Sequence, residues 1–211
     1  MNRICEIAVT AGLALAAAVS LSAQAPARPL SAVGNASTEV GGRWVKTEKT
    51  SSYDGGKWID ITYGRPRLRY RAKIFGSGPD YGKALLAGAP IWRAGANVST
   101  RIKTETALMI AGKHVPPGEY SIFIDAKEGN WTFVLSSWAA QQQYDKANTA
   151  ALWGAYGYTP EKDVVRAPMT LSTLPSSVEE LTWNFVDMTD KGGKLAIMWE
   201  KTMATVAFTT M

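Results

Sequence analysis

Short segments in which apolar and polar residues alternate run through most of this chain, and they constrain its fold more than any other feature. The clearest is WIDITY at 58–63, where Ile59, Ile61 and Tyr63 fall on one face of an extended strand. Similar segments occur at 99–110, 119–126, 131–136, 163–171, 180–188, 194–200 and 204–210. Such a series, without regular strand–helix alternation, predicts an all-β protein: an antiparallel β-sandwich of about nine to eleven strands.

One segment departs from the alternation. Residues 138–151 are rich in Ala and Gln, which favour helices, and Ser136 or Ser137 can cap a helix that follows. We therefore expect one short helix near 138–151. The segments 119–126 and 131–136, in contrast, should pair as a hairpin across residues 127–130.

The N-terminal segment has the features of a secretory signal peptide. Arg3 precedes an apolar run from Ile7 to Leu21, and small residues follow. We expect a signal peptide at 1–25, a flexible tether rich in small residues at 26–42, and a single β-sandwich domain at 43–211. The mature protein would then be periplasmic or secreted, with no transmembrane segment after cleavage. The alternative is that the apolar run is retained as an anchor.

The single cysteine, Cys5, lies within this segment. A mature protein without a thiol has no disulfide, no cysteine metal site and no cysteine nucleophile. His114 is the only histidine, so a zinc-type ligand cluster is not expected either. We predict no metal and no cofactor.

Catalytic groups are sparse. His114 is the only histidine available as a general base, and no G-x-S-x-G motif provides a serine nucleophile. Glu161 and Asp163 have the same strand parity and form the one candidate acid–base pair. Ion pairs with Lys162 and Arg166, or contact with solvent, are the preferred interpretation of these carboxylates.

Arginine recurs at every second position from 65 to 71, in the sequence RPRLRYR. In an extended strand these four side chains would lie on one face about 6.5–7 Å apart. They would then form either a ladder for phosphate, carboxylate or sulfate groups, or a charged edge strand that discourages pairing with other chains. Nucleic-acid binding is not expected, because the basic run lacks a helix or an aromatic sheet motif, and export removes the usual partner.

Two further segments combine aromatic, polar and small residues. WRAGAN at 92–97 suggests close backbone approach with Arg93 and Asn97 held in place, and WGAYGY at 153–158 suggests an aromatic platform. Stacking of Arg93 on an aromatic ring and burial of the aromatics in the core are the structural alternatives. The candidate ligand-binding residues are Arg65, Arg71, Trp92, Arg93, Asn97, Trp153 and Tyr156.

Several motifs together resemble a known family. YGRP, IFG, WRAGAN, GKHVPPGEYSIFI, NWTFVL, WGAYGYTPEKDVVRA and NFVDMTDKGGKLAIMWE occur in this order over residues 55–211. In order and spacing they are similar to DUF2911, a family of exported bacterial proteins of unknown function. The resemblance implies a β-rich exported domain and brings no activity, cofactor or catalytic residue with it.

The density of arginine and aromatic residues favours one functional hypothesis over two others. We expect a non-catalytic binding module of the bacterial envelope that recognises an anionic or carbohydrate-like ligand. The alternatives are an envelope hydrolase that uses carboxylates or His114, and a structural scaffold that assembles with another envelope protein through a sheet edge.

Overall fold

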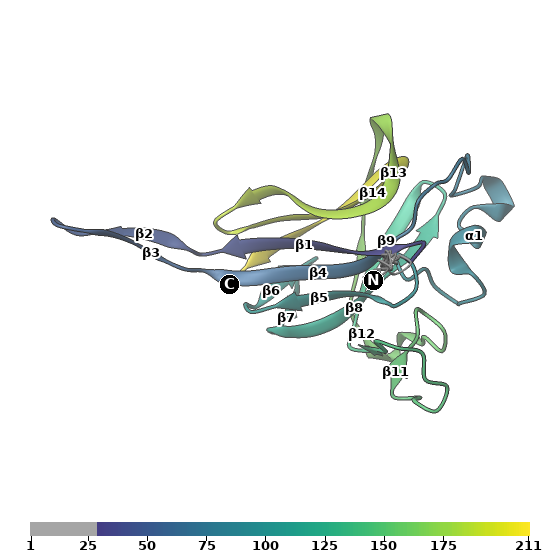
Figure 1. Ribbon diagram of the computed structural model, residues 1–211, viewed down its shortest axis with the longest axis horizontal. Helices are drawn as coiled ribbons and strands as arrows, with labels where there is room; N and C mark the ends of the chain where they lie inside the picture. The colour runs from purple at the N-terminus through teal and green to yellow at the C-terminus, as the bar shows by residue number, and fades with distance from the viewer. Residues whose placement is uncertain (1–28) are drawn as a thin grey trace, which may run out of the picture.

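A computed structural model describes residues 29–211, so the predicted signal peptide lies outside the described residues. The larger of two main antiparallel sheets has the order β1-β4-β5-β8-β9-β12. Its strands are β1 (Ala32–Val40), β4 (Lys57–Arg65), β5 (Thr100–Thr104), β8 (Gly118–Lys127), β9 (Asn130–Ser136) and β12 (Asp163–Pro168). The second sheet has the order β13-β14-β6-β7, with β13 (Thr170–Thr189), β14 (Gly192–Thr210), β6 (Leu108–Ile110) and β7 (Lys113–Val115). The all-β prediction is therefore confirmed (Figure 1).

The remaining elements are small. β2 (Arg43–Lys46) pairs with β3 (Ser51–Asp54), and β10 (Ala139–Ala140) forms a short parallel pair with β11 (Ala151–Leu152). One α-helical turn, α1 (Lys83–Leu86), and two 3-10 turns, η1 (Gly78–Asp80) and η2 (Pro160–Lys162), complete the described chain. None of these helices is long and apolar enough to cross a membrane.

The two main sheets share one apolar core. Ile59, Ile61 and Tyr63 are buried as the alternation predicts, and they belong to the same cluster as Trp183 and Ile197 of the second sheet. An aromatic group lies within this cluster, where Phe75 packs against Tyr81, Trp92, Trp131 and Trp199. Most of the apolar burial that stabilises the fold is therefore concentrated between the two sheets.

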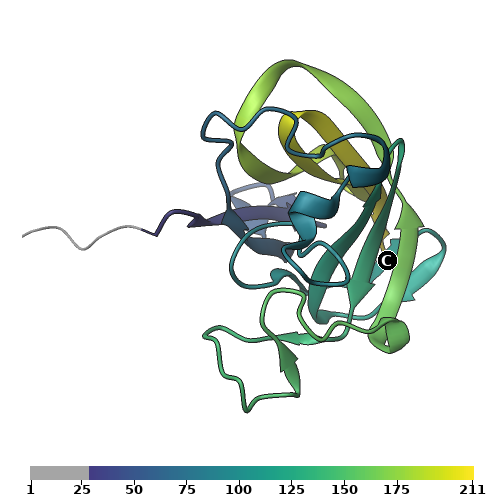
Figure 2. The same cartoon turned by 90° about the vertical axis from the view of Figure 1, so that its right-hand side faces the viewer.

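The opposite, outer face of the six-stranded sheet is only partly covered. Over β8 and β9, Phe123 and Val134 form a second cluster with Ile91, Leu152 and Ala155, which come from the long connections of the chain. These connections, which carry α1 and β11, gather at one end of the molecule (Figures 1 and 2). Over β1, β4 and β5 most of the outer positions are polar and at least partly accessible.

At the other end, the hairpin of β2 and β3 projects beyond the body of the molecule (Figure 1). We call residues 41–56 the arm. Its eight strand residues are all exposed, and pairs of glycine, Gly41-Gly42 and Gly55-Gly56, mark its base. A Cβ on Gly56 would overlap the carbonyl of Val40, so the two chains approach each other there more closely than side chains allow.

The predicted helix at 138–151 is wrong: the segment is an irregular loop between β10 and β11. The buried side chain of Gln141 organises it, with Nε2 donating to the carbonyls of Asp145, Asn148 and Ala151 and Oε1 accepting from the Asp145 amide. An isolated helix of this length is marginal in water, so one buried amide and the packing of Leu152 outweigh local propensity.

The predicted tether at 26–42 is wrong for residues 32–40, which form β1. Nine residue pairs join β1 to β4 in continuous register, from Ala32 opposite Arg65 to Val40 opposite Lys57. The small residues that suggested flexibility fit this pairing instead, since a Cβ on Gly34 would overlap the side chain of Arg65. Part of the tether, 26–28, lies outside the described residues.

Strand β4 offers a direct test of the inward and outward faces. Ile61→Ala should lower the free energy of unfolding by about 2–5 kcal/mol, because it leaves a cavity in the shared core. Thr62→Ala, at the next, outward position, should lower it by less than about 1 kcal/mol. Urea denaturation of both variants measures the two losses. Equal losses would contradict the assignment of faces.

Candidate functional site

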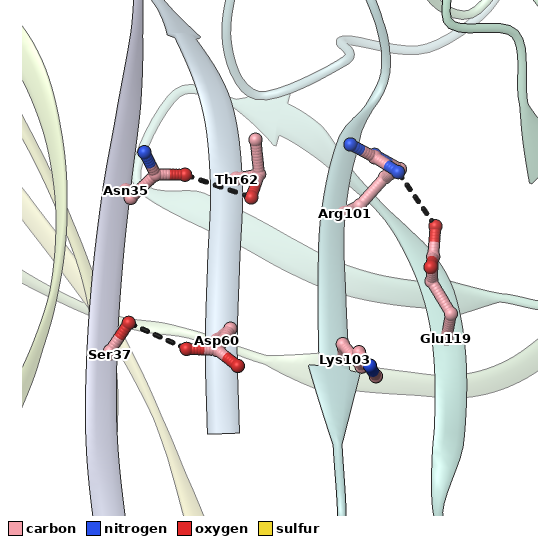
Figure 3. A pocket seen from close by; sticks show the side chains of 7 residues that line it. All are labelled: Asn35, Ser37, Asp60, Thr62, Arg101, Lys103 and Glu119. Atoms are coloured by element: carbon pink, nitrogen blue, oxygen red, sulfur yellow. Dashed lines mark hydrogen bonds and ion pairs between the residues drawn. The ribbon is translucent and has the colours of Figure 1, made fainter. Parts of the chain in front are cut away.

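A polar hollow of about 350 Å³ lies on the open outer face of the six-stranded sheet. Its walls are side chains from four neighbouring strands (Figure 3). The lining residues are Asn35, Ser37, Asp60, Thr62, Arg101, Lys103 and Glu119. We call this set the outer hollow.

Strand register brings these residues together in two rows. In the first row, Asn35 lies opposite Thr62, which lies opposite Arg101. The Thr62 hydroxyl donates to Asn35 Oδ1 at 3.0 Å. Every second residue of a strand faces the same side, so Thr62 points outward while Ile61 enters the core.

The second row lies two residues further along each strand. Ser37 is opposite Asp60, Asp60 is opposite Lys103, and Lys103 is opposite Glu119. The Ser37 hydroxyl donates to Asp60 Oδ1 at 2.6 Å, so this carboxylate is already oriented. The row therefore presents one hydroxyl, two carboxylates and one ammonium group across four strands (Figure 3).

Arg101 is the most constrained cation of the outer hollow. Its side chain is only 22% exposed, and NH1 donates to Glu119 Oε1 at 2.9 Å. Its Nε is buried and has no acceptor among the described residues. A buried donor without a partner costs about 1–3 kcal/mol.

The charges of the outer hollow cancel. Asp60 and Glu119 balance Arg101 and Lys103, and within residues 29–211 no carboxylate lies within 4 Å of the Lys103 ammonium. A balanced surface does not attract polyanions, whose binding depends on an excess of cations. It suits a ligand with many hydroxyl groups, which donate and accept hydrogen bonds.

Two loops border the outer hollow. Gly64 occupies the outward position beyond Thr62 and lies under Ala96, where a Cβ would overlap the Ala96 carbonyl. Ser121, opposite Arg101, donates from its hydroxyl to the carbonyl of Trp138 at 2.7 Å. The loop at 94–97 and the segment from 138 onward therefore close two sides of the hollow.

The arginines at 65–71 form neither an extended ladder nor an edge strand. β4 lies between β1 and β5 and ends at Arg65, and the following residues cross to β13, where Arg67 bridges Glu180. Arg69 and Tyr70 have φ values of 48° and 65°, a left-handed turn that breaks the alternation on which the prediction depended.

Arg65 and Arg71 accordingly have local partners. Arg65 forms an ion pair with Glu180. Arg71 donates through Nε to the Leu68 carbonyl at 3.0 Å and lies 5.9 Å from the centre of the Trp199 ring. Both side chains therefore stabilise the segment that crosses from β4 to β13.

Arg93, Asn97 and Tyr156 do come together. The Arg93 side chain donates through NH1 to the Asn97 carbonyl at 2.8 Å and lies 5.4 Å from the centre of the Tyr156 ring. Arg93 is 9% exposed, and the left-handed Gly154 packs so closely against the guanidinium that a Cβ would overlap it. This arrangement connects the two loops that border the hollow. It corresponds to the structural alternative given above, in which Arg93 stacks on an aromatic ring.

The last two predicted residues lie elsewhere. Trp92 is a core residue that exchanges backbone hydrogen bonds with Ile124, and Trp153 packs beside Tyr144 with ring centres 6.0 Å apart. None of the seven predicted side chains lines the outer hollow. The signal for Asp60, Thr62, Arg101 and Lys103 was nevertheless present, since they occupy the outward positions of predicted strands.

The residues considered for acid–base chemistry are separated. Glu161 lies in η2 and Asp163 begins β12, so they do not share one face of a strand as the sequence suggested. His114 is exposed in β7, opposite Met109. Within residues 29–211, no three His, Cys, Asp or Glu side chains are grouped as a metal site would require.

Asp163 instead belongs to a structural cluster beside β9. It accepts hydrogen bonds from the Tyr158 hydroxyl at 2.7 Å and from Arg166 at 2.8 Å. Burial, and then the hydrogen bond to Asp163, raise the pKa of Tyr158 above its ordinary value near 10. The neutral phenol is thus the form that the fold stabilises.

This cluster predicts a loss of stability in alkali. The pKa of Tyr158 is higher in the folded protein than in the unfolded chain. The neutral phenol therefore contributes fully to the free energy of unfolding below about pH 10, and this contribution disappears as the pH rises toward the pKa of the folded state. Between pH 9 and pH 11.5 the stability advantage of the wild-type protein over Tyr158→Phe should shrink, as measured by urea denaturation. Tyr144→Phe, at an exposed site, is the control. Parallel pH curves for wild type and Tyr158→Phe would exclude this coupling.

Comparison with known proteins gives one match. The model of the family "Protein of unknown function (DUF2911)" matches residues 46–208. No curated protein and no solved structure matches the chain. Because the match spans most of the sequence, this chain belongs to the DUF2911 family.

Proposed function

We propose that this protein is an exported, non-catalytic binding module of the bacterial envelope, and that the outer hollow binds a carbohydrate-like ligand. The observation that carries the proposal is the hollow itself: seven polar side chains from four adjacent strands, with balanced charge, on the part of the outer sheet face that the long connections leave uncovered. The features of the N-terminal sequence support the export part of the proposal.

The lining favours a sugar over a simple anion. An anion that approached Arg101 or Lys103 would also meet the carboxylates of Asp60 and Glu119, which repel it. A sugar hydroxyl can donate to Asp60 or Asn35 and accept from Lys103 or the guanidinium of Arg101. A sugar that carries one carboxylate also fits, because Lys103 lacks an ion-pair partner among the described residues.

A binding role also agrees with the way in which the carboxylates are held. Asp60 accepts a hydrogen bond from Ser37, and Glu119 accepts one from Arg101. Hydrogen-bond donors that hold a carboxylate in one orientation leave its remaining lone pairs directed toward a ligand.

The proposal is tested with a glycan array of neutral and acidic sugars, followed by titration calorimetry on the glycans that bind. Arg101→Gln and Asp60→Asn should each weaken binding by about tenfold or more, since each removes a charged hydrogen-bonding group from the site. Lys127→Gln, which changes an exposed lysine at the far end of β8, is the matched control and should bind normally.

Two results would overturn the proposal. One is the absence of binding to every glycan on the array by the folded wild-type protein. The other is binding that Arg101→Gln and Asp60→Asn leave unchanged while both variants keep the wild-type stability.

A further inference from the structure

We infer that the ligand is a linear chain of several sugar residues, and that Trp58 and the aromatic pair of the arm, Trp44 and Tyr53, bind it next to the outer hollow. This inference rests on the proposed function and extends it from one sugar to a polymer. It follows from a third row of outward side chains and from the position of the arm.

The third row continues the outer hollow toward the arm. Two residues beyond Asp60 on the same face lies Trp58, which is 46% exposed and opposite Glu39 of β1. The backbone amide of Trp58 donates to the Glu105 carboxylate at 3.0 Å, which fixes the strand at this point. An accessible indole therefore stands directly beside the polar rows.

The arm adds a second aromatic group, which a hydrogen bond joins to the third row. Trp44 lies opposite Tyr53, with ring centres 5.4 Å apart, and the two side chains are 72% and 48% exposed. The Tyr53 hydroxyl donates to Glu39 Oε2 at 2.8 Å, and the other oxygen of Glu39 accepts from the Gly56 amide. Glu39 thus connects the arm to the row that contains Trp58.

The glycines at the base of the arm permit this arrangement. A Cβ on Gly42 would overlap the Tyr53 hydroxyl, so the tyrosine ring can lie along the arm toward Glu39 only because Gly42 has no side chain. Gly41 has a φ of 75°, which few other residues adopt. The glycines at the base of the arm thus determine where the aromatic pair lies.

The result is a long, narrow surface. Trp44 lies nine positions after Asn35, and at about 3.3 Å per residue a fully extended chain of that length would cover at most about 30 Å. Along it, polar rows are followed by Trp58 and then by Trp44 and Tyr53. Aromatic rings offer a flat apolar surface to the C–H face of a sugar, while the polar rows bind its hydroxyls.

The chemistry of the arm favours a glycan over a bilayer. A hairpin that enters a membrane needs an apolar tip, but the tip here, Thr47-Glu48-Lys49-Thr50, is polar and carries both charges. Trp44 and Tyr53 lie well behind that tip, on the side of the ribbon. A chain laid along the surface reaches them, whereas a membrane approached end-on does not.

The test is calorimetry with oligomers of one to six residues, prepared from β-1,4-glucan and chitin, together with any array hit. For the wild type, affinity should rise by about tenfold or more from one residue to six. Trp44→Ala and Trp58→Ala should remove most of this rise and leave the binding of the shortest ligand unchanged, whereas Arg101→Gln should weaken every length. Tyr70→Ala, which removes a fully exposed aromatic outside the surface, is the control.

The outcomes separate this inference from the proposed function. If glycans bind with no dependence on length, or if Trp44→Ala and Trp58→Ala leave the rise intact, the extended surface is wrong and the outer hollow stands. If no glycan binds, both fail. Loss of vesicle binding, or of a dimer in light scattering, in Trp44→Ala without any effect on glycans would assign the arm to a membrane or to a second copy and overturn the inference.

Discussion

The pairing of β1 with β4 is the interaction on which the rest of this structure depends. Nine residue pairs in unbroken register place Asn35 and Ser37 beside Thr62 and Asp60, and so complete the outer hollow. The same two strands continue through the glycine pairs into the arm. Without β1, β4 would be an edge strand with unpaired backbone groups, which invites association with other chains.

The two faces of the six-stranded sheet have different surroundings. Its inner face packs against the second sheet in one aromatic-rich core, and this burial stabilises the fold. Its outer face is covered over β8 and β9 by two connections, which Arg93 and Gly154 fasten together. The uncovered part over β1, β4 and β5 carries the polar side chains of the outer hollow. Arg93, prominent in the sequence, therefore supports the border of the site from below its surface.

Residues that stand out in a sequence are not always those that line a site. Four arginines at alternate positions suggested a charged ladder, but the left-handed residues Arg69 and Tyr70 turn the chain and direct it toward β13. The outer hollow, in contrast, consists of ordinary polar residues whose proximity is a product of strand register. No short motif records that proximity, because its members come from four strands spread over residues 35–119.

The sequence alone determined the strand pattern, the inward face of each strand and the family, because the alternation of side chains is local and burial selects the apolar face. The same alternation places Asp60, Thr62, Arg101 and Lys103 at outward positions. The tertiary structure decided three further matters: that residues 32–40 form a strand, that residues 138–151 are not a helix, and which outward positions lie open. Each depends on contacts between segments far apart in the chain, such as β1 with β4 or the burial of Gln141 and Leu152, and such contacts outweigh local propensity.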